Sequence, residues 1–540
     1  MFCWQCEWTK NGTGCQSLGN CGKTPQVAAL SDLLLFTVKR LGGAAHLART
    51  IGSVSEPIIR QVDRFLVKGL YATLSNVNFD PEKLSNLIDE AEDLRENLTK
   101  NPALSDLSTQ PLMKGLSLLE RIELGAKYPV NDLASLPLLS LRETTLYGLK
   151  GLAAYAYHAA KLGREDPGLY ALVEHTLAKS LDPTLTTVDD WLKQALAVGE
   201  KNLLALELLD AAHTDTFGIP RPTSVKLGGL QGPAILVSGH DLKDLSQLID
   251  QAKKLGVLVY THGEALPAHG YPALKPGLAG HWGTGWQNQT KELAAFPGPI
   301  VFTTNCLQKP AESYRERVFV LSPVGWPGVK TIEDGQHLDF GAALKMALEL
   351  GGFTQDQPQG EVTVGWGWSA VLSAAGQIKE LVTSGRLRRF LLVGGCDGHG
   401  QGRAYYRDLV AQAPSDTVIL TLGCGKFRFF DQKLGDLDGV PRLLDLGQCN
   451  DAFSAIKIAL ALAEVFNTPV NDLPLSLILS WHEQKACAIL LSLLSLGIKN
   501  IRLGPTLPAF LHPDILNALV TGYDLKPTTT PEADLKAILV

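Results

Sequence analysis

Four cysteines open this chain of 540 residues, at Cys3, Cys6, Cys15 and Cys21, with 2, 8 and 5 residues between them. Four thiols in so short a segment have two common uses, as ligands of a metal centre or as partners in disulfides. A chain of this length buries enough apolar surface to fold without disulfides. The total of nine cysteines is also odd, so they cannot all pair. We therefore expect a metal centre, either a zinc knuckle or an iron–sulfur cluster.

A second group of potential metal ligands lies in the second half of the chain, where most of the residues follow short β-rich runs. In parallel α/β sheets, binding sites form outside the carboxyl ends of the strands. A single cysteine is usually a core thiol, which is our interpretation of Cys487. Several thiols with imidazole and carboxylate groups at the same sheet edge indicate a shared site instead. The residues of this group are His240, His262, Glu264, Cys306, Cys396, Cys424, Cys449, Glu483 and Lys485.

The mixture of side chains in this second group favours iron. Thiolates are soft ligands that select zinc, copper(I) or iron–sulfur clusters, whereas carboxylate and imidazole are harder ligands. Structural zinc sites are closed, tetrahedral and usually built from residues close in sequence. The residues of the second group are instead spread over much of the chain. They are better suited to a cluster with both sulfide and oxygen bridges.

The elements that must position these residues are of two kinds. Residues 24–216 carry apolar side chains at three- and four-residue spacing, the pattern of amphipathic helices. After Pro220, β-rich runs alternate with helical ones, which predicts parallel sheets covered by helices. The β-rich runs are 234–238, 257–261, 300–304, 318–321, 390–393, 417–421, 475–479 and 500–503.

These patterns predict a multidomain protein that combines α and α/β domains. An N-terminal helix-bundle domain, with the cysteine motif at its start, covers residues 1–216. Two Rossmann-like parallel α/β domains follow at 217–362 and 363–540, and both contribute residues to the second site. The glycine- and proline-rich stretch 353–360 is the expected junction between them.

Charge and hydropathy exclude some classes of partner. The net charge is −6 and there is no basic block, which argues against binding to nucleic acid or to an anionic membrane surface. The longest apolar run, 488–498, is too short to span a membrane. We find no charged and apolar leader with a cleavage site, so we expect a cytoplasmic protein.

Short segments, in order along the chain, resemble the motifs of one known protein family. The first is Met-Phe-Cys-Trp-Gln-Cys-Glu at 1–7, followed by Cys15 and Cys21 at the family's spacing. Further segments are Ser-Gly-His-Asp-Leu at 238–242, Tyr-Thr-His-Gly-Glu at 260–264, Leu-Pro-Ala-His-Gly-Tyr-Pro at 266–272, Thr-Thr-Asn-Cys at 303–306, Gly-Gly-Cys-Asp-Gly at 394–398, Gly-Cys at 423–424 and Leu-Gly-Gln-Cys-Asn-Asp at 446–451. With these segments the chain resembles the hybrid-cluster proteins, also called prismane proteins or hydroxylamine reductases, and specifically their [4Fe-4S] members.

The resemblance implies two clusters. The N-terminal cysteines would hold a [4Fe-4S] cluster, and the second group would hold a hybrid [4Fe-2O-2S] cluster in which Cys396 carries an extra sulfur as a persulfide. Lys485 and His262 would be candidate proton donors beside this cluster, His262 next to a ligand rather than a ligand itself. The implied hybrid-cluster ligands are His240, Glu264, Cys306, Cys396, Cys424, Cys449 and Glu483.

The activity implied by the resemblance is the reduction of hydroxylamine to ammonia and water, with electrons entering at the N-terminal cluster. The same hybrid cluster could instead reduce nitric oxide to nitrous oxide, as a defence against nitrosative stress. A third alternative is a redox sensor or a protein that transfers NO to thiols, although a sensor would need only the N-terminal cluster. The sequence has no flavin or nicotinamide fingerprint. We therefore expect a separate reductase or ferredoxin as electron donor, and a monomeric protein.

Two positions depart from the family pattern. Ala265 stands where relatives usually carry methionine, and the segment 397–403 after Cys396 is richer in glycine. Neither departure changes an implied ligand. We expect them to affect the shape of the pocket and access to it rather than cluster assembly.

Overall fold

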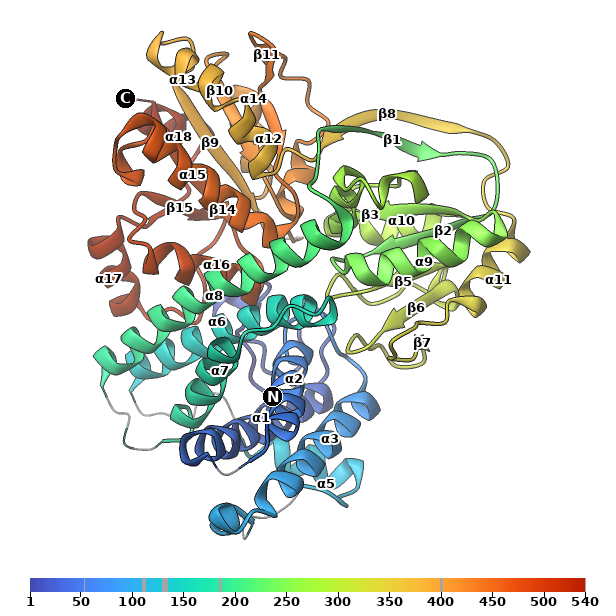
Figure 1. Ribbon diagram of the computed structural model, residues 1–540, viewed down its shortest axis with the longest axis vertical. Coiled ribbons are helices and arrows are strands. Elements are labelled where there is room, and N and C mark those ends of the chain that lie inside the picture. The colour runs from blue at the N-terminus through green and yellow to red at the C-terminus, as the bar shows by residue number, and fades with distance from the viewer. Residues whose placement is uncertain are drawn as a thin grey trace.

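The computed structural model describes residues 1–52, 54–108, 113–128, 135–182, 184, 187–398 and 402–539. Figure 1 shows helices of the N-terminal region in blue and cyan, a first sheet in green and yellow, and a second sheet in orange and red. Within these described ranges, no helix is both long and apolar enough to cross a membrane.

The N-terminal region is helical, as the pattern over residues 24–216 predicts. Its helices are α1 (Pro25–Ile51), α2 (Glu56–Ala72), α3 (Pro81–Thr99), α4 (Ser105–Ser108), α5 (Leu118–Gly125), α6 (Leu136–Lys161), α7 (Pro167–Lys179) and α8 (Val188–Phe217). The side chains of Thr24 and Thr187 accept backbone hydrogen bonds at the starts of α1 and α8, where helical N–H groups lack partners. Helix α6 is buried on nearly every side, so it occupies the centre of the bundle.

The first sheet has eight strands in the order β7-β6-β5-β2-β3-β4-β1-β8. All neighbouring pairs are parallel except β1 and β8. The strands are β1 (Thr223–Gly229), β2 (Ala234–Ser238), β3 (Leu258–His262), β4 (Leu278–His281), β5 (Ile300–Phe302), β6 (Val318–Leu321), β7 (Lys330–Ile332) and β8 (Gln357–Val364), and the helices are α9 (Leu242–Leu255), α10 (Gln289–Ala295) and α11 (Gly341–Leu350). Strand β8 begins within the stretch 353–360 and returns the chain to this sheet.

The second sheet has six parallel strands in the order β13-β10-β9-β14-β15-β16. They are β9 (Arg389–Gly395), β10 (Thr417–Thr421), β13 (Leu443–Asp445), β14 (Leu475–Ser480), β15 (Ile501–Gly504) and β16 (Lys526–Pro527). A separate pair is formed by β11 (Asp436–Leu437) and β12 (Val440–Pro441), and the helices are α12 (Trp368–Ser373), α13 (Ala375–Thr383), α14 (Ala404–Gln412), α15 (Ala452–Phe466), α16 (Gln484–Ser495), α17 (Pro513–Tyr523) and α18 (Pro531–Ile538).

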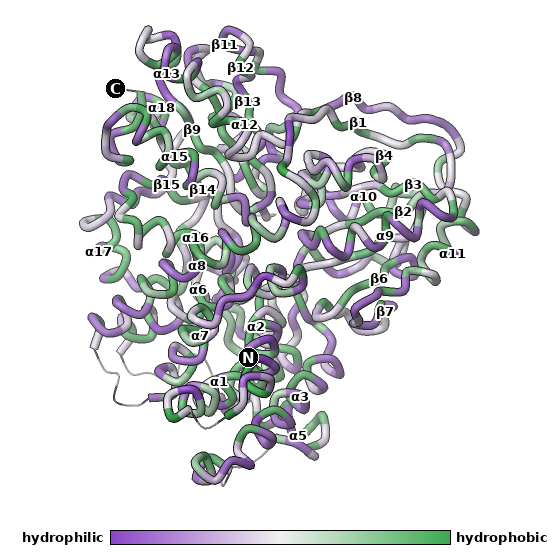
Figure 2. Tube along the Cα trace, in the orientation of Figure 1, coloured by the Kyte–Doolittle hydropathy of each residue, from purple (hydrophilic) through white to green (hydrophobic). Residues whose placement is uncertain are grey.

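The second sheet shares its core with the helical region. One continuous hydrophobic cluster includes Leu34 of α1, Leu206 of α8 and Leu491 of α16. Figure 2 shows hydrophilic stretches on outer helices such as α3 and α9. The two α/β regions and the helical bundle together surround the carboxyl ends of buried strands such as β2 and β10.

Candidate metal centres

The carboxyl ends of strands from both sheets meet around one cavity. Its wall contains all seven implied hybrid-cluster ligands and Lys485. Three of these ligands follow β2, β3 and β5 of the first sheet, and four follow β9, β10, β13 and β14 of the second. The parallel direction of the strands brings these residues to one edge of each sheet. The lining residues are Asn76, His240, Glu264, Trp286, Asn305, Cys306, Cys396, Asp397, Cys424, Cys449, His482, Glu483 and Lys485.

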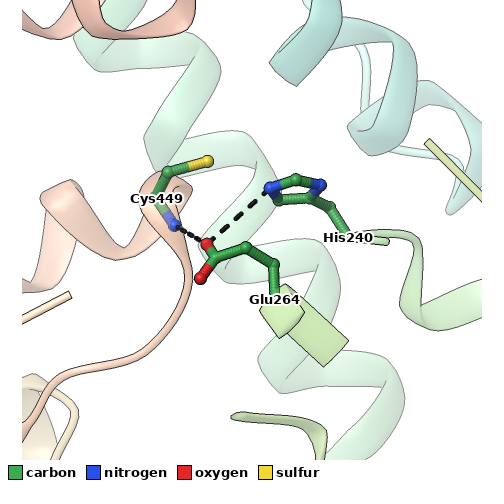
Figure 3. Close-up of side chains that lie close together, drawn as sticks. All are labelled: His240, Glu264 and Cys449. Atoms are coloured by element: carbon green, nitrogen blue, oxygen red, sulfur yellow. Dashed lines mark hydrogen bonds and ion pairs between the residues drawn. The ribbon is translucent and has the colours of Figure 1, made fainter. Parts of the chain in front are cut away.

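Three ligand-type residues lie particularly close together (Figure 3). One potential ligand atom each of His240, Glu264 and Cys449 lies within 4.8 Å of the other two. Glu264 Oε2 is 3.7 Å from His240 Nε2 and accepts a 2.9 Å hydrogen bond from the backbone N–H of Cys449. Gln448 Nε2 donates to the carbonyl oxygens of both His240 and Glu264. One amide side chain thus holds loops from the two sheets together.

The second carboxylate oxygen of Glu264 is unsatisfied within the described residues. Oε1 is buried and has no hydrogen-bond partner in the described part of the chain. Burial raises the pKa of this carboxyl above its ordinary value. A buried polar atom without a partner is costly. A metal ion would supply the missing partner, and the nearby imidazole and thiols complete a donor set that fits an iron–sulfur cluster with additional oxygen ligands.

The four thiols around the cavity all have raised pKa values. Burial raises the pKa of Cys306 to about 12 and that of Cys449 to about 11. Burial also raises the pKa of Cys396 and of Cys424 well above the ordinary thiol value. Without a metal these thiols are protonated at neutral pH, so metal binding must release protons.

Lys485 places a cation at the cavity wall. Its Nζ donates to Asn305 Oδ1 at 2.9 Å and lies 3.7 Å from Glu483 Oε1. Glu483 also lies next to a thiol, since its Oε1 is 3.9 Å from the Sγ of Cys396. The structure therefore brings Lys485 into the ligand group.

His262 is not brought to the cavity. Its Nδ1 lies 3.0 Å from Ser238 Oγ, and its Nε2 lies 3.0 Å from Glu292 Oε2. Both ring nitrogens are thus engaged by residues that do not line the cavity. This contact joins the ends of β2 and β3, the two strands that precede His240 and Glu264.

The four N-terminal cysteines form a compact loop. Cys3 and Cys15 exchange two backbone hydrogen bonds, at 3.0 and 2.8 Å. Cys6 and Cys15 are buried, whereas Cys3 and Cys21 are partly exposed. All nine cysteines are free, so the disulfide alternative does not hold. Burial raises the pKa of Cys6, as do the neighbouring cysteines, which is the expected state of clustered thiols before metal binding.

Five lining residues were not singled out from the sequence. Three of them directly precede or follow an implied ligand in the sequence, so this position could have pointed to a role in the site. They are Asn305, Asp397 and His482. Asn76 follows α2 and Trp286 lies in a short 3-10 helix between β4 and α10. No sequence pattern connects these last two residues with the site, because only tertiary packing brings them there.

Glycine permits the close approach of the loops that follow the second sheet's strands. Gly395, directly before Cys396, has a φ of +116°, and a Cβ there would lie 2.1 Å from the carbonyl oxygen of Ser480. Gly423, directly before Cys424, has a φ of +75°, and its Cβ would lie 2.5 Å from the carbonyl oxygen of Gly395. Neither conformation nor space suits another residue.

The structure describes the first departure from the family pattern fully and the second only in part. Ala265 is buried in the 3-10 helix that carries Glu264 and lies outside the cavity wall. Within the segment after Cys396, residues 399–401 lie outside the described residues.

Comparison with known proteins identifies the family. A family model described as the Prismane/CO dehydrogenase family matches residues 1–536. The chain belongs to this family. It is 51% identical, over 553 residues, to a protein of Solidesulfovibrio magneticus named hydroxylamine reductase, and 49% identical, over 550 residues, to one of Methanocella arvoryzae with the same name. In both cases the match covers 100% of each chain.

Solved structures of the family share the fold at much lower sequence identity. Carbon monoxide dehydrogenase IV from Carboxydothermus hydrogenoformans matches 97% of this chain and 89% of its own, with a TM-score of 0.55 and 17% identity. An alpha-subunit structure of acetyl-CoA synthase/carbon monoxide dehydrogenase, a protein with NiZn[Fe4S4] and NiNi[Fe4S4] clusters, matches 99% and 86%, with a TM-score of 0.58 and 16% identity. The multidomain arrangement of helices and parallel α/β sheets is therefore that of this family.

Proposed function

We propose that this protein is an oxidoreductase that reduces hydroxylamine to ammonia and water at an iron–sulfur cluster. The observation that carries the proposal is the cavity wall, where the seven implied ligands, namely four thiols, one imidazole and two carboxylates, converge beside one lysine. Relatives matching the whole chain at about half identity are named hydroxylamine reductase, which supports the same activity.

The donor sets support two cofactors. The seven cavity ligands would hold the hybrid [4Fe-2O-2S] cluster, with the orphaned oxygen of Glu264 as one ligand atom and Cys396 as the persulfide. The four N-terminal cysteines would hold a [4Fe-4S] cluster. When bound, the hybrid cluster supplies electrons and an open iron position that acts as a Lewis acid.

The chain's own contribution to the chemistry is a proton at Lys485 Nζ. Cleavage of the N–O bond of hydroxylamine consumes two electrons and two protons, and the departing oxygen must be protonated. Burial alone would lower the pKa of Lys485, but the negative charges that Cys449 and Glu483 carry when ionised raise it well above its ordinary value. The amine is thus held charged, and Asn305 orients it at 2.9 Å. His262, held between Ser238 and Glu292, would position the end of β3.

Electrons must come from outside the chain. Cys3 and Cys21 are partly exposed, so the N-terminal loop is the part of the electron path that a donor protein can approach. A separate reductase or ferredoxin would dock at this loop. We place the protein in the cytoplasm as a monomer.

Metal analysis and EPR on the anaerobically purified protein test the proposal. We expect about eight irons, from two four-iron clusters, with acid-labile sulfide and an EPR signal beyond that of a [4Fe-4S] cluster. Cys396→Ala should lose or alter that signal and hydroxylamine reduction together. About four irons with no effect of Cys396→Ala would leave only the N-terminal cluster, and zinc without iron would refute the enzyme assignment.

An apolar cavity favours nitric oxide as a second candidate substrate. It has a volume of about 170 Å³, touches Cys396 and Cys449, and is otherwise lined almost entirely by apolar side chains, many of them on α8, α15, α16 and α17. Some of these, including Val188 and Leu460, are exposed at the surface. Apolar cavities of this size stay dry and hold apolar guests. This space suits an uncharged diatomic gas better than hydroxylamine, so assays should include NO reduction to nitrous oxide.

A further inference from the structure

The N-terminal cysteine loop is hydrogen-bonded to the segment that follows β14. The backbone N–H of Glu7 donates to the carbonyl oxygen of His482 at 2.9 Å. Gln484 Nε2 donates to the carbonyl oxygen of Gln5 at 2.6 Å. Two segments far apart in sequence are thus joined by two direct hydrogen bonds.

These two bonds enclose one implied ligand of each cluster. Cys6 stands between Gln5 and Glu7, and Glu483 stands between His482 and Gln484. Cys6 is 7% exposed and Glu483 is 6% exposed, so the contact lies in the packed interior. A ligand of the N-terminal cluster and a ligand of the hybrid cluster therefore occupy segments that touch directly.

Gln484 is fixed at both ends of its amide. Its Oε1 accepts a 3.0 Å hydrogen bond from the backbone N–H of Ser75, and its Nε2 also lies 3.2 Å from Ser75 Oγ. A backbone N–H can only donate, which identifies Oε1 and directs Nε2 toward Gln5. The side chain is 1% exposed, so water does not compete for these bonds.

A buried guanidinium fastens the same two segments a second time. Arg403 pairs with the carboxylate of Glu7 and donates to the carbonyl oxygen of Trp481 at 2.8 Å. It also donates to the carbonyl oxygen of Cys396 at 3.2 Å. The N-terminal loop, the segment after β14 and the loop of the persulfide cysteine are thereby held in one fixed arrangement.

Electron transfer slows steeply with distance and with gaps in the medium between two centres, and a close-packed, hydrogen-bonded connection leaves no such gap. We propose that residues 481–485 are the electron bridge between the two cluster sites, and that Gln484 is the positioning residue that holds this bridge against the N-terminal loop. In each event one electron leaves the N-terminal cluster, which is oxidised, and enters the hybrid cluster, which is reduced. The inference rests on the proposed function, because it requires both clusters.

The test uses the holoenzyme with Gln484→Leu, which removes the amide while keeping a similar volume. The N-terminal cluster is reduced by rapid mixing with dithionite, and freeze-quench EPR follows its reoxidation as the hybrid cluster gains the electron. We expect transfer to slow by about 10- to 100-fold, with iron content and both EPR signals retained. The matched control is Asn202→Leu, which removes a buried amide that donates to Ser492 Oγ of the same helix, α16, at 2.9 Å. Transfer in this control should keep the wild-type rate.

The milder Gln484→Asn, shorter by one methylene, is measured in parallel so that the result does not depend on one variant. Slower transfer in Gln484→Asn, with both signals present, supports the bridge even where Gln484→Leu loses iron. Wild-type transfer in both Gln484 variants, or equal slowing in Asn202→Leu, would overturn it. A wild-type protein with no second cluster overturns the proposed function and the bridge together, and its iron content shows this before any rate is measured.

Discussion

Lys485 Nζ lies 3.4 Å from His240 Nε2, although the two residues follow strands of different sheets. His240 Nδ1 is occupied by Thr304 Oγ1 at 2.7 Å, which leaves Nε2 as the nitrogen that faces the cavity. The ammonium group therefore stands beside a nitrogen that an iron would occupy. Lys485 would therefore hold a proton close to a substrate at such an iron.

Replacing Lys485 with methionine should reduce the kcat for hydroxylamine by about 10²- to 10⁴-fold, because the departing oxygen loses its proton donor. Lys485→Arg distinguishes proton donation from charge alone. A guanidinium keeps the charge but does not release its proton in proteins, so the arginine variant should be as slow as the methionine variant. Steady-state kinetics and EPR on the same samples provide the check. Restored activity in Lys485→Arg would show that only the positive charge is required.

Most of the strand ends at the cavity could be predicted from sequence because the ligand-type residues there, Cys449 after β13 excepted, follow a β-rich run. Runs 234–238, 318–321 and 417–421 coincide with β2, β6 and β10. Strands β1 and β8 were missed because they are not continuous apolar runs: five of the eight residues of β8 are exposed in succession at an edge of the sheet. An edge strand does not need apolar residues on both of its faces, so the sequence pattern that predicts it is weak.

The position of His262 could not be predicted from its sequence neighbourhood. It lies two residues before Glu264, yet it is not among the residues that line the cavity, and its Nε2 is instead paired with Glu292 of α10. Nothing in the sequence shows that α10 packs on that side of β3. For the same reason Asn76 and Trp286 could not be assigned to the cavity, since the approach of the helical region to the first sheet decides their place.

Acid sensitivity should depend in part on a buried histidine outside both sites, His213. His213 on α8 is 2% exposed, and burial lowers its pKa to about 3. The unfolded chain has the ordinary histidine pKa of about 6.5 and takes up a proton first. Stability therefore falls as pH decreases from about 6.5 to about 3, by up to about 1.4 kcal/mol per pH unit.

Replacing His213 with leucine should remove this contribution to the loss of stability at low pH. Urea-unfolding midpoints are measured at about pH 7, 5.5 and 4.5, within the window set by the two pKa values. These midpoints should decline less steeply with falling pH in the variant than in the wild type. The exposed His337 provides the matched control, and His337→Leu should follow the wild-type profile. Parallel profiles for wild type and His213→Leu would contradict the prediction.

Gly395→Ala should disrupt the loop of Cys396. The new Cβ would lie 2.1 Å from the carbonyl oxygen of Ser480 at a φ of +116°, so we expect a loss of about 3 kcal/mol or more. Gly385→Ala is the control, since Gly385 has a φ of +73° but open space around it, and its cost should be only about 1–2 kcal/mol of backbone strain. Urea unfolding gives the difference, and iron analysis should show cluster loss in Gly395→Ala alone. Equal effects of the two substitutions would mean that the contact with Ser480 does not matter.

The apolar cavity offers a way to separate the two candidate substrates. Ala455 on α15 lines it, and a phenylalanine there would fill part of the space that leads to Cys396 and Cys449. If NO travels through this space, Ala455→Phe should lower kcat/KM for NO by about tenfold, about 1.4 kcal/mol in activation free energy. The kcat/KM for hydroxylamine should not change, because that polar substrate gains nothing from an apolar route. Ala461→Phe, on the same helix but outside the cavity lining, should leave both values at the wild-type level. A parallel fall for both substrates in Ala455→Phe would indicate a distorted site rather than a blocked route.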